Sequence, residues 1–155
     1  MQLLTLFALL CLLGSTLTDA TLPRRCRQQV KEAKGSCYNG KGPIKRFGYY
    51  PFAKKCHEFW ESGCLETPNQ NSFANLTECL TTCNPTSKCL KTPIKHTKLL
   101  SLKKSFVFDI KNMKCVQEKT LLRPGIGPDI NRFLKKEDCT RQCEPDLIQD
   151  ITSSG

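Results

Sequence analysis

Histidine is scarce in this chain, and its cysteines lack the spacing of metal sites. Only His57 and His96 occur among 155 residues, and no Cys-x2-Cys pair is present. Zinc sites usually combine such pairs with histidines. Enzymes that use a histidine base also need a water-excluding cleft, for which small disulfide-rich domains lack room. We therefore expect no metal, no cofactor and no enzymatic activity.

A long apolar run is also missing. The longest, residues 3–13, is interrupted by Thr5 and is too short to span a bilayer. Small residues and the site Thr18-Asp19-Ala20 follow it, as in a signal peptide with its cleavage site. We expect residues 1–20 to be removed, Cys11 with them, which leaves a secreted, extracellular chain without a transmembrane segment.

Acidic residues are absent between Asn84 and Phe108, where six lysines occur. Two interpretations stay open: the lysines bind an anionic partner such as a heparin-like polyanion, or they only keep the chain soluble. Secretion and the lack of a recognised module argue against nucleic acid. The candidate basic patch consists of Lys91, Lys95, Lys98, Lys103 and Lys104.

Cysteines are plentiful, and ten remain once Cys11 is removed. An even number in an oxidising compartment predicts five disulfides. The pattern repeats: residues 26–83 and 89–143 each contain an aromatic run before a cysteine and end in Cys-x3-Cys. We expect a twisted β-hairpin in each. Since each stretch is only about 55 residues, disulfides must supplement its hydrophobic core.

A second repeat predicts a short helix at the end of each stretch. Asn71-Ser72-Phe73 and Asn131-Arg132-Phe133 each precede the next cysteine by six residues. Asn75 is placed to cap the first helix, with Glu78 completing a capping box. Asn75 also begins an Asn-Leu-Thr sequon, which predicts a glycoprotein.

These residues carry a family resemblance. Residues 26–83 resemble a Kunitz (pancreatic trypsin inhibitor-like) domain in their six cysteines and in Phe47, Tyr49, Phe59, Gly63-Cys64 and Phe73. The resemblance implies the disulfides Cys26–Cys83, Cys37–Cys64 and Cys56–Cys79. Residues 89–143 resemble a reduced Kunitz domain, which implies Cys89–Cys143 and Cys115–Cys139. The disulfide that tethers the binding loop is missing there, and Glu118 stands where the family has a strand phenylalanine.

The expected fold is therefore small, disulfide-rich α+β, with two tandem Kunitz domains, each a twisted hairpin with a short C-terminal helix. The expected boundaries are a signal peptide at 1–20, domains at 21–84 and 89–143, a linker at 85–88 and an acidic flexible tail at 144–155. This arrangement is similar to the two-domain anti-haemostatic Kunitz proteins of tick saliva, including the tissue-factor-pathway-inhibitor-like group.

The resemblance also implies a reactive-site loop of Cys37, Tyr38 and Asn39, flanked by Trp60, Gly63 and Cys64. The family's specificity residue follows the second cysteine, which makes it Tyr38, a ring suited to a hydrophobic slot. The loop is longer than usual and contains Gly40 and Gly42, so ordering it costs more conformational entropy. Whether Tyr38 enters a protease pocket stays open, as does whether Trp60 flanks the loop or is an ordinary sheet aromatic.

Two functions follow from these expectations. The first is a monomeric serine protease inhibitor that acts on a clotting or inflammatory protease through Tyr38, with the basic second domain as an accessory anchor. The alternative is a non-inhibitory Kunitz binding module, either an ion-channel blocker or a binder of glycosaminoglycan and other anionic surfaces.

Overall fold

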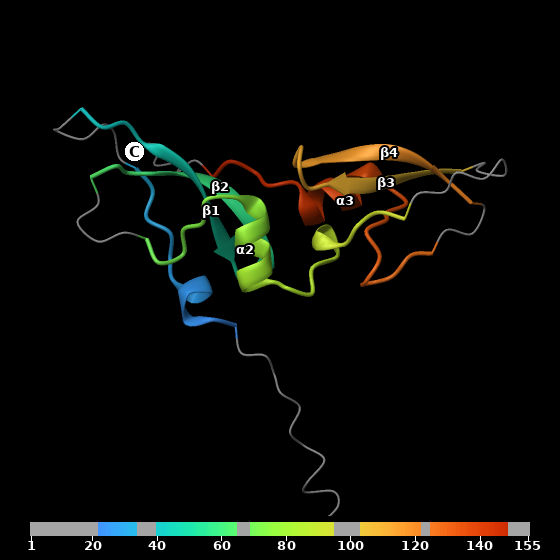
Figure 1. The fold of residues 1–155 in the computed structure, drawn as a ribbon, viewed down its shortest axis with the longest axis horizontal. Coiled ribbons are helices and arrows are strands. Elements are labelled where there is room, and N and C mark those ends of the chain that lie inside the picture. Colours follow the sequence, from blue (N-terminus) through green and yellow to red (C-terminus); the bar gives the residue numbers. More distant parts are fainter. Residues whose placement is uncertain (1–21, 34–39, 65–68, 95–102, 122–124, 149–155) are drawn as a thin grey trace, which may run out of the picture.

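The computed structural model describes residues 22–33, 40–64, 69–94, 103–121 and 125–148. These residues form a first half (22–84) and a second half (85–148), each with an antiparallel hairpin followed by a short helix (Figure 1). The first half contains η1 (Arg24–Arg27), β1 (Ile44–Tyr50), β2 (Lys55–Glu61) and α2 (Leu76–Cys83). The second contains η2 (Lys88–Leu90), β3 (Lys103–Asp109), β4 (Lys114–Thr120) and α3 (Lys136–Cys143). The predicted small α+β fold with hairpins and helices is confirmed.

The two hairpins share one turn geometry. In each, four residues separate the paired strand ends, Tyr50 with Lys55 and Asp109 with Lys114. The last turn residue has a positive φ in both, 49° at Lys54 and 53° at Met113. The Asp109 side chain supports the second turn, because its Oδ1 accepts from the Lys111 amide at 3.0 Å.

A buried asparagine fastens each hairpin to the segment before its helix. Asn71 accepts from the Tyr49 amide at 2.9 Å and donates to the Tyr49 carbonyl at 2.8 Å. Asn131 makes the same two bonds to Phe108, at 2.9 and 2.8 Å. The residue two positions on is a phenylalanine in both halves, and it pairs with a strand phenylalanine, Phe47 with Phe73 and Phe106 with Phe133. This explains why the Asn-x-Phe pattern occurs twice.

Disulfides fill the centre of each half. Four lie among the described residues, and all join cysteines of the same half: Cys26–Cys83, Cys56–Cys79, Cys89–Cys143 and Cys115–Cys139. They are the pairs that the family resemblance implies. Cys64 is also disulfide-bonded, while its expected partner Cys37 lies outside the described residues.

The segment 144–148 links the two halves, although the sequence predicts a flexible tail from residue 144. Its first residue is fixed to the second half, because Glu144 Oε1 accepts from the Cys115 amide at 2.6 Å. Its later residues run parallel to β2: the Glu58 amide donates to the Asp146 carbonyl, and the Ile148 amide donates to the Glu58 carbonyl, both at 2.9 Å. We call residues 144–148 the C-terminal clasp.

A buried lysine strengthens this contact. Lys55 is 5 % exposed, and its Nζ lies 2.9 Å from Asp146 Oδ2 and donates to the Thr140 carbonyl in α3 at 3.4 Å. His57 Nδ1 is 3.5 Å from the same carboxylate oxygen. The clasp therefore neutralises a cation that β2 buries, and local sequence gives no signal for it.

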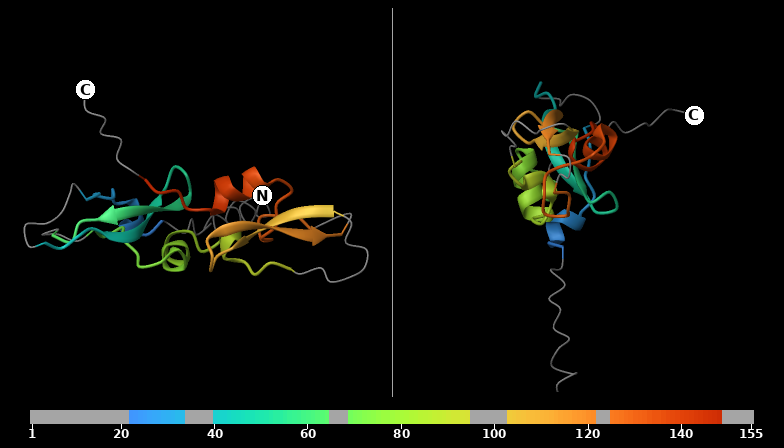
Figure 2. Two further views of the ribbon diagram at one scale, coloured as in Figure 1. Left: turned by 90° about the horizontal axis from the view of Figure 1, so that it is seen from above. Right: turned by 90° about the vertical axis from the view of Figure 1, so that its right-hand side faces the viewer.

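The molecule is elongated, with the hairpin turns near its middle and the open ends of the hairpins pointing outward (Figures 1 and 2). A contact between the halves agrees with this view, because Lys55, which directly follows the first turn, donates from Nζ to the Thr140 carbonyl in α3 at 3.4 Å. The start of β1 and the end of β2 therefore lie at one pole, and the start of β3 and the end of β4 at the other.

Candidate functional site

The first candidate site is the open end of the β1–β2 hairpin. Cys37, Tyr38 and Asn39 lie outside the described residues. The residues on either side of them are described below. Gly40 has a φ of 75°, a conformation that glycine adopts without strain. A Cβ at Gly40 or Gly42 would meet open space. No neighbouring atom therefore restricts the side chain at these two positions before β1.

The strand ends display two large apolar side chains. Ile44 is 51 % exposed and Trp60 is 40 % exposed. In the register Ile44 faces Glu61 and Lys45 faces Trp60, so the two apolar side chains point to opposite faces of the hairpin. The Ala33 amide donates to the Trp60 carbonyl at 2.7 Å, which joins β2 to the segment that precedes Cys37. Both interpretations of Trp60 remain open.

Glu61 organises the polar contacts beneath this end. Its Oε1 accepts from Asn69 Nδ2 at 2.9 Å, its Oε2 accepts from Ser72 Oγ at 3.1 Å, and Arg46 Nε lies 3.5 Å from Oε2. Asn69 also bonds both backbone groups of Lys31, each at 2.9 Å. The Glu61 carboxylate and the Asn69 side-chain amide therefore join the hairpin to the segments that precede and follow it.

The flank beyond β2 is polar. Ser62 Oγ lies 3.1 Å from Cys64 Sγ and accepts from the Cys64 amide at 3.3 Å. Because Cys64 is disulfide-bonded, these bonds orient a cross-linked cysteine just after Gly63. The predicted flanking residues Trp60, Gly63 and Cys64 thus follow one another at the end of one strand.

The second candidate site is the open end of the β3–β4 hairpin. Lys91, Lys103 and Lys104 of the predicted basic patch are exposed, while Lys95 and Lys98 lie outside the described residues. The register places Lys119 directly opposite Lys104, and Lys119 is exposed as well. Sequence reasoning missed Lys119, although its alternation in β4 could have indicated it.

Lys88 does not belong to this basic surface, although it belongs to the acid-free stretch. Its Nζ lies 4.2 Å from the centre of the Phe133 ring and donates to the Arg132 carbonyl at 3.3 Å. Burial lowers the pKa of Lys88 from its usual value. In the first half Arg25 lies over Phe73 in the same way, at 4.1 Å.

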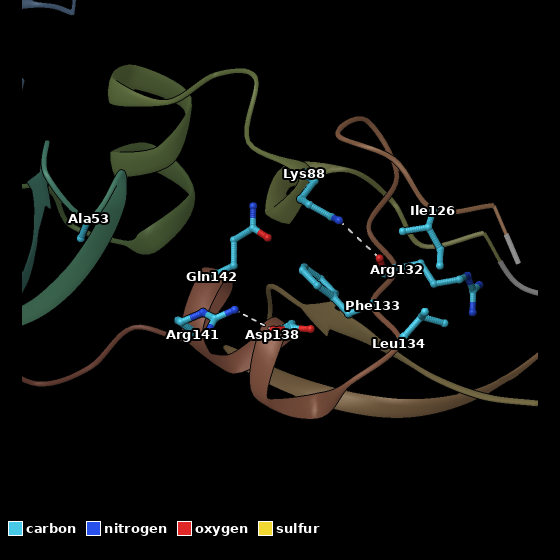
Figure 3. A pocket seen from close by; sticks show the side chains of 9 residues that line it. All are labelled: Ala53, Lys88, Ile126, Arg132, Phe133, Leu134, Asp138, Arg141 and Gln142. Carbon is cyan, nitrogen blue, oxygen red and sulfur yellow. Dashed lines mark hydrogen bonds and ion pairs between the residues drawn. The ribbon is translucent and has the colours of Figure 1, made fainter.

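Figure 3 shows the hollow into which Lys88 points. Its volume is about 630 Å³, and residues of both halves line it: Ala53, Lys88, Ile126, Arg132, Phe133, Leu134, Asp138, Arg141 and Gln142. Arg141 and Asp138 neutralise each other across 2.6 Å. Ala53, in the turn of the first hairpin, is the lining residue that comes from the first half.

Two searches of the described residues were negative. Neither a membrane-spanning helix nor a cluster of three or more metal-binding side chains occurs in the part of the chain that the structure describes.

Comparison with known proteins decides the family of the first half. The model of the Kunitz/bovine pancreatic trypsin inhibitor domain matches residues 25–84. These residues are a Kunitz domain. Haemaphysalin of Haemaphysalis longicornis is 28 % identical over 125 residues, which are 79 % of this chain and 74 % of that protein. The predicted likeness to tick Kunitz proteins is confirmed.

Two further matches are more partial. Papilin of Drosophila melanogaster is 24 % identical over 145 residues, and this chain spans 5 % of its length. The solved structure of calcicludine is 35 % identical, covers 40 % of this chain and 92 % of its own, and has a TM-score of 0.33. The family match ends at residue 84. The Kunitz domain therefore accounts for the first candidate site only.

Proposed function

We propose that this chain is a secreted, anti-haemostatic inhibitor of serine proteases, which acts through the loop of its Kunitz domain that contains Tyr38. The observation that carries the proposal is the Kunitz match over residues 25–84. Inhibitors of this type offer a protease a substrate-like loop. They bind tightly when that loop needs little ordering.

The described contacts support such pre-organisation. The chain enters the loop from residues 31–33, which Asn69 and the Trp60 carbonyl hold against β2. It leaves the loop through Gly40 into β1, which Arg46 connects to Glu61. The two ends of the loop are thereby fixed to one scaffold, which offsets part of the ordering cost of a longer loop.

Inhibition constants test the role of Tyr38. The protein should inhibit chymotrypsin-like proteases better than trypsin-like ones, since an aromatic ring suits a hydrophobic slot. Tyr38→Ala should weaken that inhibition by about 100-fold, because a buried interface anchor contributes about 2–4 kcal/mol. Tyr38→Arg should move the preference toward trypsin-like proteases.

A control changes a tyrosine of the β1–β2 hairpin. Tyr50 lies at the turn end of β1, where burial, with the nearby Glu32 carboxylate, raises its pKa to about 12. Tyr50→Phe should leave inhibition unchanged. If Tyr38→Ala behaves like Tyr50→Phe, the working surface is not this loop.

We also propose that residues 89–143 form a second, reduced Kunitz domain whose open end binds polyanions. The repeated asparagine clamp, phenylalanine pair and disulfide positions support the domain assignment. The pairing of Lys104 with Lys119 favours the polyanion, because like charges directly opposite destabilise a hairpin. A bound anionic ligand removes that repulsion.

Retention on immobilised heparin tests this second function. Changing Lys103, Lys104 and Lys119 to Ser should lower the salt needed for elution much more than changing Lys31, Lys111 and Lys136, which are also exposed. Both sets remove three charges. Equal shifts would show that net charge, and no localised site, explains retention. Retention that falls as salt rises is expected in either case.

A further inference from the structure

Arg132 is an unusual residue for the centre of a small domain. It is 1 % exposed, and its guanidinium reaches three groups. Nη1 donates to Ser105 Oγ at 2.5 Å, Nη2 donates to the Ile94 carbonyl, and Nη2 lies 3.9 Å from Glu118 Oε2. Figure 3 shows its side chain turning away from Lys88, which bonds its carbonyl.

The first half has an apolar residue where the second half has the glutamate of this cluster. The hairpins align so that Glu118 corresponds to Phe59, which is fully buried, and Ser105 corresponds to Arg46. Arg132 corresponds to Ser72, since each lies between the clamp asparagine and the paired phenylalanine. The second half has thus exchanged a strand phenylalanine for a glutamate and gained a buried arginine beside it.

The bond to Ile94 has a counterpart in the first half. Asn71 donates to the Gln28 carbonyl and Asn131 donates to the Lys91 carbonyl, both at 2.9 Å, which aligns these two segments. Three residues further on, the Lys31 carbonyl accepts from Asn69, and the Ile94 carbonyl accepts from Arg132. By the same spacing Asn69 corresponds to Asp129, which is exposed.

We infer that Arg132 is a positioning residue, which fastens segment 91–94 to the second hairpin. Asn69 performs this task in the first half, where Cys64 is disulfide-bonded as well. The second half has no cysteine between Cys89 and Cys115 or between Cys115 and Cys139, so no such disulfide is possible there. Arg132 and its Glu118 partner supply a polar fastening instead. This inference deepens the proposed polyanion site, because segment 91–94 contains Lys91 and leads directly to Lys95.

A double variant separates positioning from folding. Arg132→Leu with Glu118→Phe removes the ion pair and gives the strand the phenylalanine that the first half has at this position. Replacing a buried ion pair by apolar residues is often neutral or stabilising. Backbone order parameters from ¹⁵N relaxation then report on each segment. We expect the value at the Ile94 amide to fall from about 0.85 to below about 0.6, while Val116 in β4 and Ala33 in the first half keep rigid-backbone values.

Arg141→Met with Asp138→Ala is the charge-matched control, because it also removes one ion pair, which lies on the exposed side of α3. It should leave the order parameter at Ile94 unchanged. An unchanged value at Ile94 in the double variant, with Val116 still rigid, would overturn the inference. If Val116 also becomes disordered in the double variant, Arg132→Lys is the deciding variant, because lysine keeps the positive charge but lacks the forked guanidinium donor. The order parameter should then fall at Ile94 and not at Val116. An unchanged order parameter at Ile94 would refute the positioning role.

The relaxation measurement needs no polyanion, so it stands apart from the proposed function. Heparin retention of the double variant is measured separately. A mobile Ile94 with unchanged retention would leave the positioning role intact and remove its link to polyanion binding.

Discussion

Gly48 leaves less room for a side chain than Gly40 or Gly42 does. A Cβ there would lie 2.6 Å from Val30 Cγ2 and 3.3 Å from the Asn71 carbonyl oxygen. Overpacking of this kind typically costs about 1–3 kcal/mol. Gly48→Ala should therefore lower the free energy of unfolding by that amount in chemical denaturation, and Val30→Ala should recover part of it. Gly42→Ala, which meets open space, is the control, and an equal loss there would contradict the packing explanation.

Single residues were predictable where the chain repeats itself. The Asn-x-Phe pattern at residues 71 and 131 indicated an equivalent role, and the structure gives both asparagines the same bonds. Arg132 stands inside the second copy of that pattern, yet its burial could not be foreseen. From sequence alone an arginine is expected at the surface. Its partners Ser105 and Glu118 come beside it only through the β3–β4 register.

The two helices differ in how they begin. The Asn75 side chain accepts from the Glu78 amide at 2.8 Å, and Glu78 accepts from the Ala74 amide at 3.0 Å. The capping box is therefore present, with Glu78 reaching one residue further back than expected. At the start of α3, Lys135 has the extended backbone of a cap but offers no side-chain bond.

This difference predicts opposite effects of substitution. Asn75→Ala should cost about 1 kcal/mol of stability, whereas Lys135→Ser should add about 0.5–1 kcal/mol by supplying the missing acceptor. Asn75→Asp keeps an acceptor while it removes the sequon, so it should be near neutral. Lys136→Ser, one residue past the cap, removes the same charge as Lys135→Ser. Equal gains from the two lysine changes would mean that charge, and not capping, is responsible.

Elements were predictable where their signals are local. Alternating aromatics next to a cysteine indicated both hairpins, and Asn75 with Glu78 indicated α2. The C-terminal clasp gives no such signal, because its partner strand β2 lies far away in sequence and its acidic residues are also typical of a solvated tail. The prediction of a flexible tail therefore did not anticipate that residues 144–148 contact Glu58 and Lys55.

The contact between the halves should make the whole molecule sensitive to mild acid. Burial lowers the pKa of His57 from its usual value, the Lys55 cation lowers it further, and Asp146 opposes the shift. The rings of His57 and Tyr50 are perpendicular, with their centroids 5.1 Å apart. In the unfolded chain His57 takes up a proton near pH 6.5. The folded chain takes it up at a lower pH, so stability is lost as pH falls below about 6.5.

Denaturation at pH 7.5 and 5.5, with disulfides intact, measures this loss. The native chain should lose more stability across the interval than His57→Gln does, since glutamine does not titrate. Asp146→Asn should enlarge the loss in the native-His57 background, because it removes the opposing carboxylate. A His57→Gln chain with the same loss as its parent would assign the acid sensitivity to other groups.

The C-terminal clasp also determines how the chain can be divided. A fragment that ends after residue 84 contains all of the matched Kunitz domain, yet it leaves Lys55 buried without Asp146 and exposes the backbone groups of Glu58 along β2. An uncovered strand edge is a template for pairing between molecules. The isolated domain would therefore tend to self-associate, and its inhibition constants would describe a different species from the intact chain. A fragment series is interpretable only if residues 144–148 are supplied, for example as a peptide fused beside β2.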